Sequence, residues 1–256
     1  MKIIAISNQK GGVGKTTTAT ALAYGLKKRG KKVLLVDCDS QSNSTSYYHA
    51  SSEDGYPTLS DFLYTDEPAT ECIQHTDVGD ILAADDLLDD AELHLKGVSG
   101  FYRLKNRLSE LEGLYDHIIL DTPPNLGILL QNALIAAQGV IVPVPCEEFA
   151  VQGMAKFSGT VSEVKAQANP DLRVLGLLLV MYDGRLVLTK EIDRGLPEIA
   201  KLLGTEVFGT RIRKTATVGK AQGTRVQLLE YDPKCTAAAD YERFIDELRE
   251  RGFIDG

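Results

Sequence analysis

The sequence has few cysteines and no long apolar run. Its four cysteines, Cys38, Cys72, Cys146 and Cys235, include no C-x-x-C pair, so their spacing predicts neither a zinc site nor a disulfide framework. No segment approaches the roughly 20 apolar residues of a membrane span, and the apolar run at the N-terminus is too short for a signal peptide. We therefore expect a cytoplasmic protein with reduced thiols.

Internal repeats, low-complexity segments and long linkers are also absent from the 256 residues. The hydrophobic residues (43%) and charged residues (25%) have the balance of an ordinary globular protein, which excludes disordered, collagen and coiled-coil classes. His49, His75, His94 and His117 show no spacing with carboxylates or cysteines that predicts a metal site. This length suffices for one large α/β core, so we expect a single domain over residues 1–256.

The charge of the chain is unevenly distributed. The net charge of −8 taken alone argues against a nucleic-acid-binding protein. Residues 51–96, however, hold thirteen acidic residues and one basic residue, so the rest of the chain carries a net charge of +4. Residues 201–225 hold six basic residues and one acidic residue. A local basic surface is therefore compatible with the acidic total, and we expect loops and short helices in the acidic stretch.

Short apolar runs rich in β-branched residues alternate with segments of helical period. Several runs are apolar almost throughout, as expected for parallel strands that helices cover on both faces. The sequence therefore predicts an α/β fold with a doubly wound, mostly parallel sheet flanked by helices. The predicted strands are residues 2–7, 32–37, 117–121, 139–144 and 172–181, and the predicted helices are residues 16–29, 186–203 and 236–251.

The strongest motif lies between the first predicted strand and the first predicted helix. Its glycines let the backbone curl so that N–H groups and the helix N-terminus point at phosphate oxygens. Lys15 would reach the β and γ phosphates, and the Thr16 hydroxyl would bind Mg²⁺. Gln9 stands where the strict pattern G-x-x-x-x-G-K-[ST] has glycine, and a chance glycine-rich turn is the alternative interpretation. The motif consists of Gln9, Lys10, Gly11, Gly12, Val13, Gly14, Lys15, Thr16, Thr17 and Thr18.

Three carboxylates follow predicted strands. Asp37 and Asp39 come at the end of the second strand, where the topology of α/β sheets places ligands. One could orient the attacking water, and the other could help to position Mg²⁺; helix capping or turn formation is the alternative. Asp121 ends the third predicted strand in the form of a Walker B acid, which would hold Mg²⁺ through a water molecule. That pattern is common alone and becomes informative behind a phosphate loop.

Together these segments resemble the deviant Walker ATPases, and in particular the ParA-type (Soj-like) partition ATPases. Lys10 occupies the position of the signature lysine of that family, and Ser40 replaces the usual proline of its D-x-D-P-Q-x-N segment. Residues 211–222 do not reproduce the chromosomal run I-P-R-N-V-R-L-S-E-A-P, which leaves plasmid and chromosomal systems both open. No helix-turn-helix domain precedes the first strand, as in the short members. The matching segments are residues 10–17, 37–43, 121–127, 142–145 and 180–185.

The resemblance implies an ATP-driven switch in a homodimer. In the family, ATP draws two subunits together, and the signature lysine crosses to the partner's phosphates, where a cation neutralises charge as an arginine finger does. Lys10 would take this role, or would complete the local loop as an exposed lysine. Asp39 would orient the attacking water, and Thr16, Asp39 and Asp121 would form the Mg²⁺ site. The implied catalytic residues are Lys10, Lys15 and Asp39, and the implied ATP-binding residues are Lys10, Gly11, Gly12, Val13, Gly14, Lys15, Thr16, Thr17, Asp37, Asp121, Pro123, Met181 and Arg213.

The resemblance also implies partners. Family members bind DNA without sequence preference as ATP dimers, associate with the nucleoid in that state, and hydrolyse ATP slowly until a ParB-like centromere-binding protein stimulates them. Arg185 matches a position where the family places a DNA-contacting arginine, and a solvated basic surface is the alternative. For Arg213, a contact near the adenine is a further alternative. The DNA-binding candidates are Arg185, Arg211, Lys214, Lys220 and Arg225.

Three other functions compete with DNA partition. A MinD-like ATPase that cycles on a membrane needs a terminal amphipathic helix with a basic polar face, but residues 238–251 carry a net charge of −2. An iron-protein-like electron donor needs a set of cysteines at its dimer interface, for which Cys146 alone is insufficient; a P-loop synthetase is the other metabolic alternative. A nucleotide-gated scaffold for another cargo is the third. We predict a ParA-like ATPase for plasmid or chromosome partition that has no membrane partner.

Overall fold

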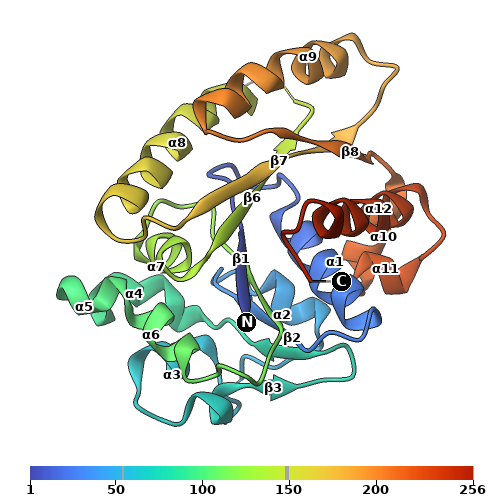
Figure 1. Cartoon of the computed structure of the whole chain (residues 1–256). Coiled ribbons are helices and arrows are strands. Elements are labelled where there is room, and N and C mark those ends of the chain that lie inside the picture. Colours follow the sequence, from blue (N-terminus) through green and yellow to red (C-terminus); the bar gives the residue numbers. More distant parts are fainter. Residues whose placement is uncertain (54, 148–149, 256) are drawn as a thin grey trace.

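Eight strands form one sheet within residues 1–53, 55–147 and 150–255, which this computed structural model describes (Figure 1). Their order is β3-β4-β2-β5-β1-β6-β7-β8, and β3 pairs antiparallel with β4. The other pairs are parallel, which confirms the predicted α/β class. The strands are β1 (Lys2–Ile6), β2 (Val33–Asp37), β3 (Gln74–His75), β4 (Asp80–Leu82), β5 (His117–Asp121), β6 (Gly139–Pro145), β7 (Arg173–Tyr182) and β8 (Val207–Arg213).

Helices cover both faces of the sheet, and each face buries its own hydrophobic core (Figure 1). Helices α3 to α9 lie over the first core, which includes Phe62 and Phe157. Helices α1, α10, α11 and α12 lie over the second core, which includes Leu22 and Phe244. The helices are α1 (Lys15–Lys28), α2 (Asn43–Tyr47), α3 (Leu59–Tyr64), α4 (Ala91–His94), α5 (Gly97–Phe101), α6 (Arg103–Ser109), α7 (Ile128–Ala136), α8 (Ala150–Gln167), α9 (Val187–Leu202), α10 (Ala216–Thr224), α11 (Leu228–Tyr231) and α12 (Thr236–Glu250).

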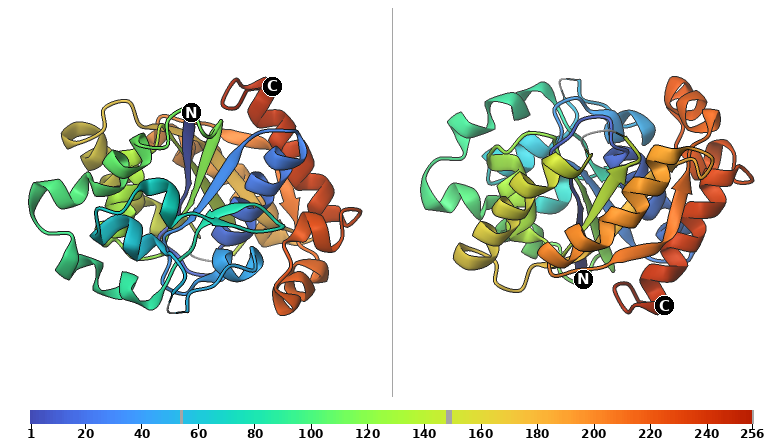
Figure 2. Two further views of the ribbon diagram at one scale, coloured as in Figure 1. Left: turned by 90° about the horizontal axis from the view of Figure 1, so that it is seen from below. Right: turned by 90° about the horizontal axis from the view of Figure 1, so that it is seen from above.

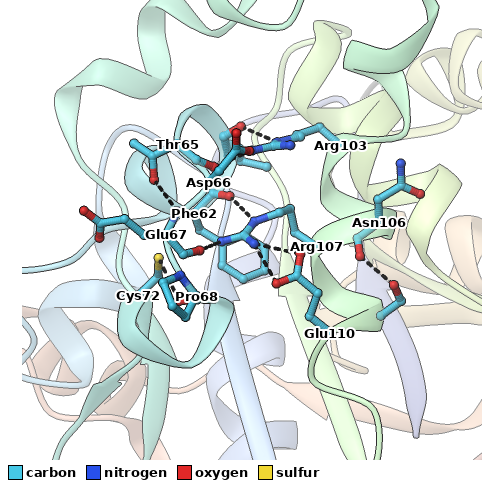
Figure 3. Close-up of polar contacts among 12 residues, drawn as sticks. Phe62, Thr65, Asp66, Glu67, Pro68, Cys72, Arg103, Asn106, Arg107 and Glu110 are labelled. Carbon is cyan, nitrogen blue, oxygen red and sulfur yellow. Dashed lines mark hydrogen bonds and ion pairs between the residues drawn. The ribbon is translucent and has the colours of Figure 1, made fainter.

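The acidic stretch of residues 51–96 folds as short elements against the first core. It contains the predicted short helices and also β3 and β4, two short strands that the sequence analysis did not predict. Arg103 and Arg107 of α6 donate to four main-chain carbonyl groups within residues 62–67 (Figure 3). Arg107 also donates to both carboxylate oxygens of Glu110 at 2.7 Å. These two guanidinium groups fix the acidic stretch onto the rest of the molecule.

All five predicted strands and all three predicted helices are present, with ends that differ by no more than one residue. The outer strand β8 was not predicted, because only part of it is buried and it carries Arg211 and Arg213. In α12, Tyr241, Phe244 and Leu248 are buried in the second core, where the helix packs on β8 and α1. Within the described part of the chain, no helix has the length and apolar character that a membrane crossing requires.

Candidate active site

The carboxyl ends of β1, β2 and β5 bring the predicted nucleotide residues together. Asp37 ends β2 and is the register partner of Asp121, which ends the neighbouring strand β5. The phosphate loop follows β1 and borders a cavity of about 790 Å³. Asp37, Asp121 and Pro123 are buried beside this cavity, whereas Pro124 takes part in its lining. The predicted residues that line the cavity are Gly11, Gly12, Val13, Gly14, Lys15, Thr16, Thr17, Asp39, Met181, Arg213, Lys214 and Arg225.

Two glycines shape the phosphate loop. Gly12, with a φ of 71°, and Gly14, with a φ of 80°, adopt the left-handed backbone that residues with a Cβ rarely adopt. Gly14 immediately precedes α1, and no side chain caps this end of the helix. The first backbone N–H groups of α1 therefore remain available at the cavity, and the first turn carries no acidic residue. Loop and helix end together form a site suited to an anionic phosphate group.

Lys15 supplies a buried positive charge at this loop. The residue is 7% exposed, and its Nζ donates a hydrogen bond to the main-chain carbonyl of Lys10 at 3.1 Å. Burial lowers the pKa of the Lys15 ammonium, and the negative charges of Asp121 and Asp39 oppose that change. A phosphate group bound at the loop would give the ammonium charged acceptors in place of the water that it lacks.

Asp37 and Asp121 form a buried pair of carboxylates. Asp37 Oδ2 accepts hydrogen bonds from the backbone N–H of Thr45 at 2.8 Å and from its hydroxyl at 2.9 Å, which fixes α2 to the end of β2. Burial raises the pKa of Asp37, and the adjacent charge of Asp121 raises it further. Burial also raises the pKa of Asp121, while hydrogen bonds from Ser44 and Thr16 lower it. Burial therefore disfavours the ionised form of both carboxylates.

The oxygen atoms around Asp121 fit a divalent cation. Asp121 Oδ2 accepts a hydrogen bond from Ser44 Oγ at 2.8 Å, whereas the buried Oδ1 has no hydrogen-bond partner among the residues that the structure describes. Thr16 contributes to lowering the pKa of this carboxylate, and both Thr16 and Asp39 line the cavity. Asp39 Oδ1 accepts a hydrogen bond from the backbone N–H of Gln41. Carboxylate and hydroxyl oxygens are the ligands that Mg²⁺ prefers. A bound cation, or a water molecule on that cation, would give the buried Oδ1 of Asp121 a partner.

Lys10 lies outside the cavity lining and is exposed. Its Nζ forms an ion pair with Glu147 Oε2 at 2.8 Å, and both side chains are about half exposed. Its backbone N–H donates to Asn8 Oδ1 at 3.1 Å, and its carbonyl accepts from Lys15. In this subunit the Lys10 ammonium thus neutralises a carboxylate at the end of β6.

A further wall of the cavity contains residues that the sequence analysis did not single out as ligands. Tyr47 of α2 and Gln222 of α10 both line this wall, and burial raises the pKa of Tyr47 to about 12. Arg213 lines the same wall and donates to the buried carboxylate of Asp240 at 2.8 Å. Helix α10 overlaps residues 211–222, where the family pattern is not reproduced, so the sequence carried no motif for this wall.

The predicted DNA-binding residues do not share one environment. The Arg185 side chain is 89% exposed and pairs with Asp183 at 2.7 Å, and these hydrogen bonds lower the pKa of Asp183 to about 2. Arg211 is only 27% exposed and bonds to Asp193 through two of its nitrogens. Lys220 is exposed on α10. Lys214 and Arg225 are exposed at the nucleotide cavity, whose lining they join.

Comparison with known proteins identifies relatives over almost the whole chain. Residues 1–174 match the family model described as AAA domain. The chain is 39% identical over 248 residues to the chromosome-partitioning ATPase Soj of Thermus thermophilus, and the alignment covers 97% of this chain and 95% of that protein. It is 37% identical over 254 residues to the sporulation initiation inhibitor protein Soj of Bacillus subtilis. That alignment covers 98% of this chain and 99% of the relative.

A solved structure is similar over the same length. The structure of a cobyrinic acid a,c-diamide synthase from Mycobacterium smegmatis, with bound ADP and magnesium, superposes with a TM-score of 0.84 at 33% identity. The match covers 98% of this chain and 96% of that one. The glycine loop and the paired carboxylates at the carboxyl edge therefore belong to a fold shared over its full length with nucleotide-binding relatives. The chain belongs to the ParA/Soj family of chromosome-partitioning ATPases, within the wider MinD/ParA group.

Proposed function

We propose that this ATPase binds ATP with Mg²⁺, dimerises in that state and binds DNA without sequence preference. A ParB-like centromere-binding protein would stimulate slow hydrolysis and so release the DNA during chromosome or plasmid partition. The observation that carries the nucleotide part is the uncapped helix end with buried Lys15, next to the orphaned Oδ1 of Asp121. The full-length similarity to proteins named for chromosome partitioning supports the cellular role.

The phosphate end of the cavity has the parts that phosphoryl transfer needs. The backbone N–H groups of residues 11–17 would bind the phosphate oxygens, and Lys15 would offset their charge. Thr16, Asp39 and Asp121 would hold Mg²⁺, which neutralises charge on the phosphates when bound. Asp39 lines the cavity and is less buried than Asp37, so Asp39 is the carboxylate that can reach an attacking water. The role of Asp37 is structural, because its Oδ2 accepts hydrogen bonds from Thr45 and its Oδ1 accepts one from the backbone N–H of Asp39.

The proposed dimer requires Lys10 to exchange its partner. The ion pair with Glu147 is exposed, and exposed pairs contribute only about 0–1 kcal/mol. The pair therefore presents a small barrier to transfer of the ammonium onto the phosphates of a second subunit. Such a transfer would place a positive charge where the leaving phosphoryl group needs it. Dimerisation and nucleotide state would then be one equilibrium.

The proposed DNA contact starts from Arg185, because its side chain is 89% exposed. Lys220 is the second free position. Arg211 would have to leave Asp193 before it could reach a phosphate. Lys214 and Arg225, which line the nucleotide cavity, are placed to report nucleotide state to a nearby DNA surface or to contact the nucleotide itself.

DNA binding by the full chain with ATP, with ADP and without nucleotide, across a salt series, tests this proposal. We expect binding only with ATP, and loss of binding in Lys10→Ala and in Arg185→Ala. Lys105→Ala, an exposed lysine on α6, is the matched control and should bind as the wild type does. With about four phosphates neutralised per dimer, the slope of log affinity against log salt would be about −3.6. A flat salt response would reject DNA binding and leave the ATPase intact.

The same preparation separates the proposal from a biosynthetic role. One solved relative carries the name of a synthase, and a synthase couples ATP consumption to an organic acceptor. ATP turnover measured with and without cobyrinic acid, in the presence of ammonium and glutamine as nitrogen donors for the amide, distinguishes the two functions. We expect the acceptor to leave turnover unchanged.

A further inference from the structure

Three large apolar side chains are exposed at the end of the acidic stretch and just beyond it. Leu87 is 57% exposed, Leu93 is 64% exposed and Val98 is 77% exposed. All three lie within residues 86–101, which we call the acidic ridge; it comprises a 3-10 helix at Asp86–Asp90, followed by α4 and α5. The ridge protrudes beside α6 in Figure 1. Its charged residues are Asp86, Asp89, Asp90, Glu92 and Lys96, all of them exposed.

Buried side chains and hydrogen bonds attach the ridge to the rest of the molecule. Leu88, Ala91 and Leu95 alternate with the exposed residues and are buried in the first core. The side chain of Asn132, fully buried in α7, donates to the Gly100 carbonyl at 2.9 Å and accepts from the Leu104 backbone N–H at 3.0 Å. The buried neighbours and these hydrogen bonds fix the backbone of the ridge. The exposed apolar side chains are therefore held in solvent by a packed segment.

Arginine side chains fix the next helix as well. Arg103 and Arg107 of α6, which follows the ridge directly, bind the main chain of residues 62–67 (Figure 3). Arg107 lies over the ring of Phe62 at 4.9 Å from its centroid. A partner that docks on the ridge would meet a preorganised surface, so it would not have to order this segment on binding.

The charge of the ridge selects its occupant. Within residues 86–101 the exposed apolar side chains share the segment with four acidic residues and one lysine. A second copy of the ridge, a nucleic acid and an anionic membrane would each bring negative charge against it. A segment with lysine or arginine around leucine-sized side chains would match both the charge and the apolar positions. We propose that residues 86–101 are a docking surface for a basic, leucine-containing helical segment of a partner protein.

This surface adjoins the chain segment that carries the Walker B acid. Glu92 lies beside Gly127, where an added Cβ would come within 3.4 Å of Glu92 Oε1. Helices α4 and α5 both contact α7, and residues 122–127 connect the start of α7 to Asp121. A partner on the ridge would thus sit at the outer end of the segment that leads to the active-site carboxylate. The docking surface itself does not depend on the proposed DNA binding.

A labelled helical peptide tests the proposal on the full chain. Its leucines recur at positions i, i+3, i+4 and i+7 and its remaining positions are lysine, whereas a twin peptide has serine in place of every leucine. Fluorescence anisotropy gives the affinity of each peptide. We expect the leucine peptide to bind at least about tenfold more tightly than its twin, and the double variant Leu93→Ser, Val98→Ser to lose about tenfold in affinity.

Controls separate the ridge from general attraction of a cation to an acidic protein. Leu202→Ser changes an equally exposed leucine, 81% exposed on α9, and should alter the affinity by less than about twofold. The double variant should keep the wild-type unfolding temperature, because it replaces only exposed side chains. Equal binding of both peptides, or equal binding to wild type and double variant, would overturn the proposal. Self-association that the double variant abolishes would also overturn it, since the occupant would then be a second copy.

Discussion

Asp39 is the single residue on which the proposed hydrolysis most depends. It lines the nucleotide cavity, and its carboxylate accepts a hydrogen bond from the backbone N–H of Gln41. Because orientation of the attacking water by a carboxylate contributes about 10²–10⁴-fold, Asp39→Ala should lower the rate of ATP hydrolysis by that factor. Binding of a fluorescent ATP analogue should persist. Asp77→Ala, an exposed carboxylate far along the chain, serves as the control, and hydrolysis unchanged in Asp39→Ala would contradict the assignment.

His117 is the residue that should make stability depend on pH. It is fully buried, and neither ring nitrogen has a hydrogen-bond partner within the described part of the chain. Burial lowers the pKa of its imidazole from the usual 6.5, and the charges of Asp255 and Asp116 oppose that change. The unfolded chain therefore takes up a proton near pH 6.5 that the folded chain takes up only at lower pH. Stability from this residue is complete above pH 6.5 and is lost as the pH falls below it.

Urea unfolding at pH 7.5 and at pH 5.5 measures this effect. The loss of unfolding free energy between the two pH values should be smaller in His117→Phe than in the wild type. His49→Gln replaces a half-exposed histidine and should keep the wild-type pH dependence. An identical acid-induced loss in His117→Phe and wild type would show that other groups carry it.

At the scale of elements, strand β7 packs closely against the second core at Gly176. A Cβ added at Gly176 would lie 2.5 Å from Phe208 Cε2, and the Phe208 ring is held edge-on against Phe244 at 4.9 Å between centroids. Gly176→Ala should therefore lower the free energy of unfolding by about 1–3 kcal/mol. Gly159→Ala on α8 meets no atom within 4 Å and should not destabilise the protein. Thermal unfolding of both variants gives the comparison.

The central elements were predictable because their apolar runs are continuous, as in β5, which is buried at every residue. Strands β3 and β4, of two and three residues, are too short to leave a periodic signal. The phosphate loop and its carboxylates follow chain-local motifs, so the sequence placed them together. Tyr47 of α2 and Gln222 of α10 line the same wall of the cavity, and a single sequence does not encode such long-range proximity in any local pattern.

At the scale of the whole molecule, Glu147 should restrain dimerisation. It holds Lys10 within its own subunit, and an exposed pair is worth up to about 1 kcal/mol. Glu147→Gln should therefore strengthen ATP-dependent dimerisation by up to about fivefold, as sedimentation velocity can measure. Glu198→Gln, which breaks the exposed pair with Lys201 on α9, is the matched control. Weaker dimerisation in Glu147→Gln would mean that this carboxylate belongs to the dimer contact instead.

The two chain ends and the nucleotide cavity lie at opposite ends of the parallel strands. Lys2 Nζ pairs with Asp255 Oδ1 at 2.7 Å, next to His117 at the amino edge of the sheet. Figure 2 shows the N-terminus and the end of α12 on the same side of the molecule. The nucleotide cavity, by contrast, opens at the carboxyl edge. A fluorophore or a surface tether attached near residue 2 or residue 255 would therefore stand a full strand length from the cavity. Both attachment points would leave the cavity open for nucleotide entry, so single-molecule recordings of the ATPase can use either one.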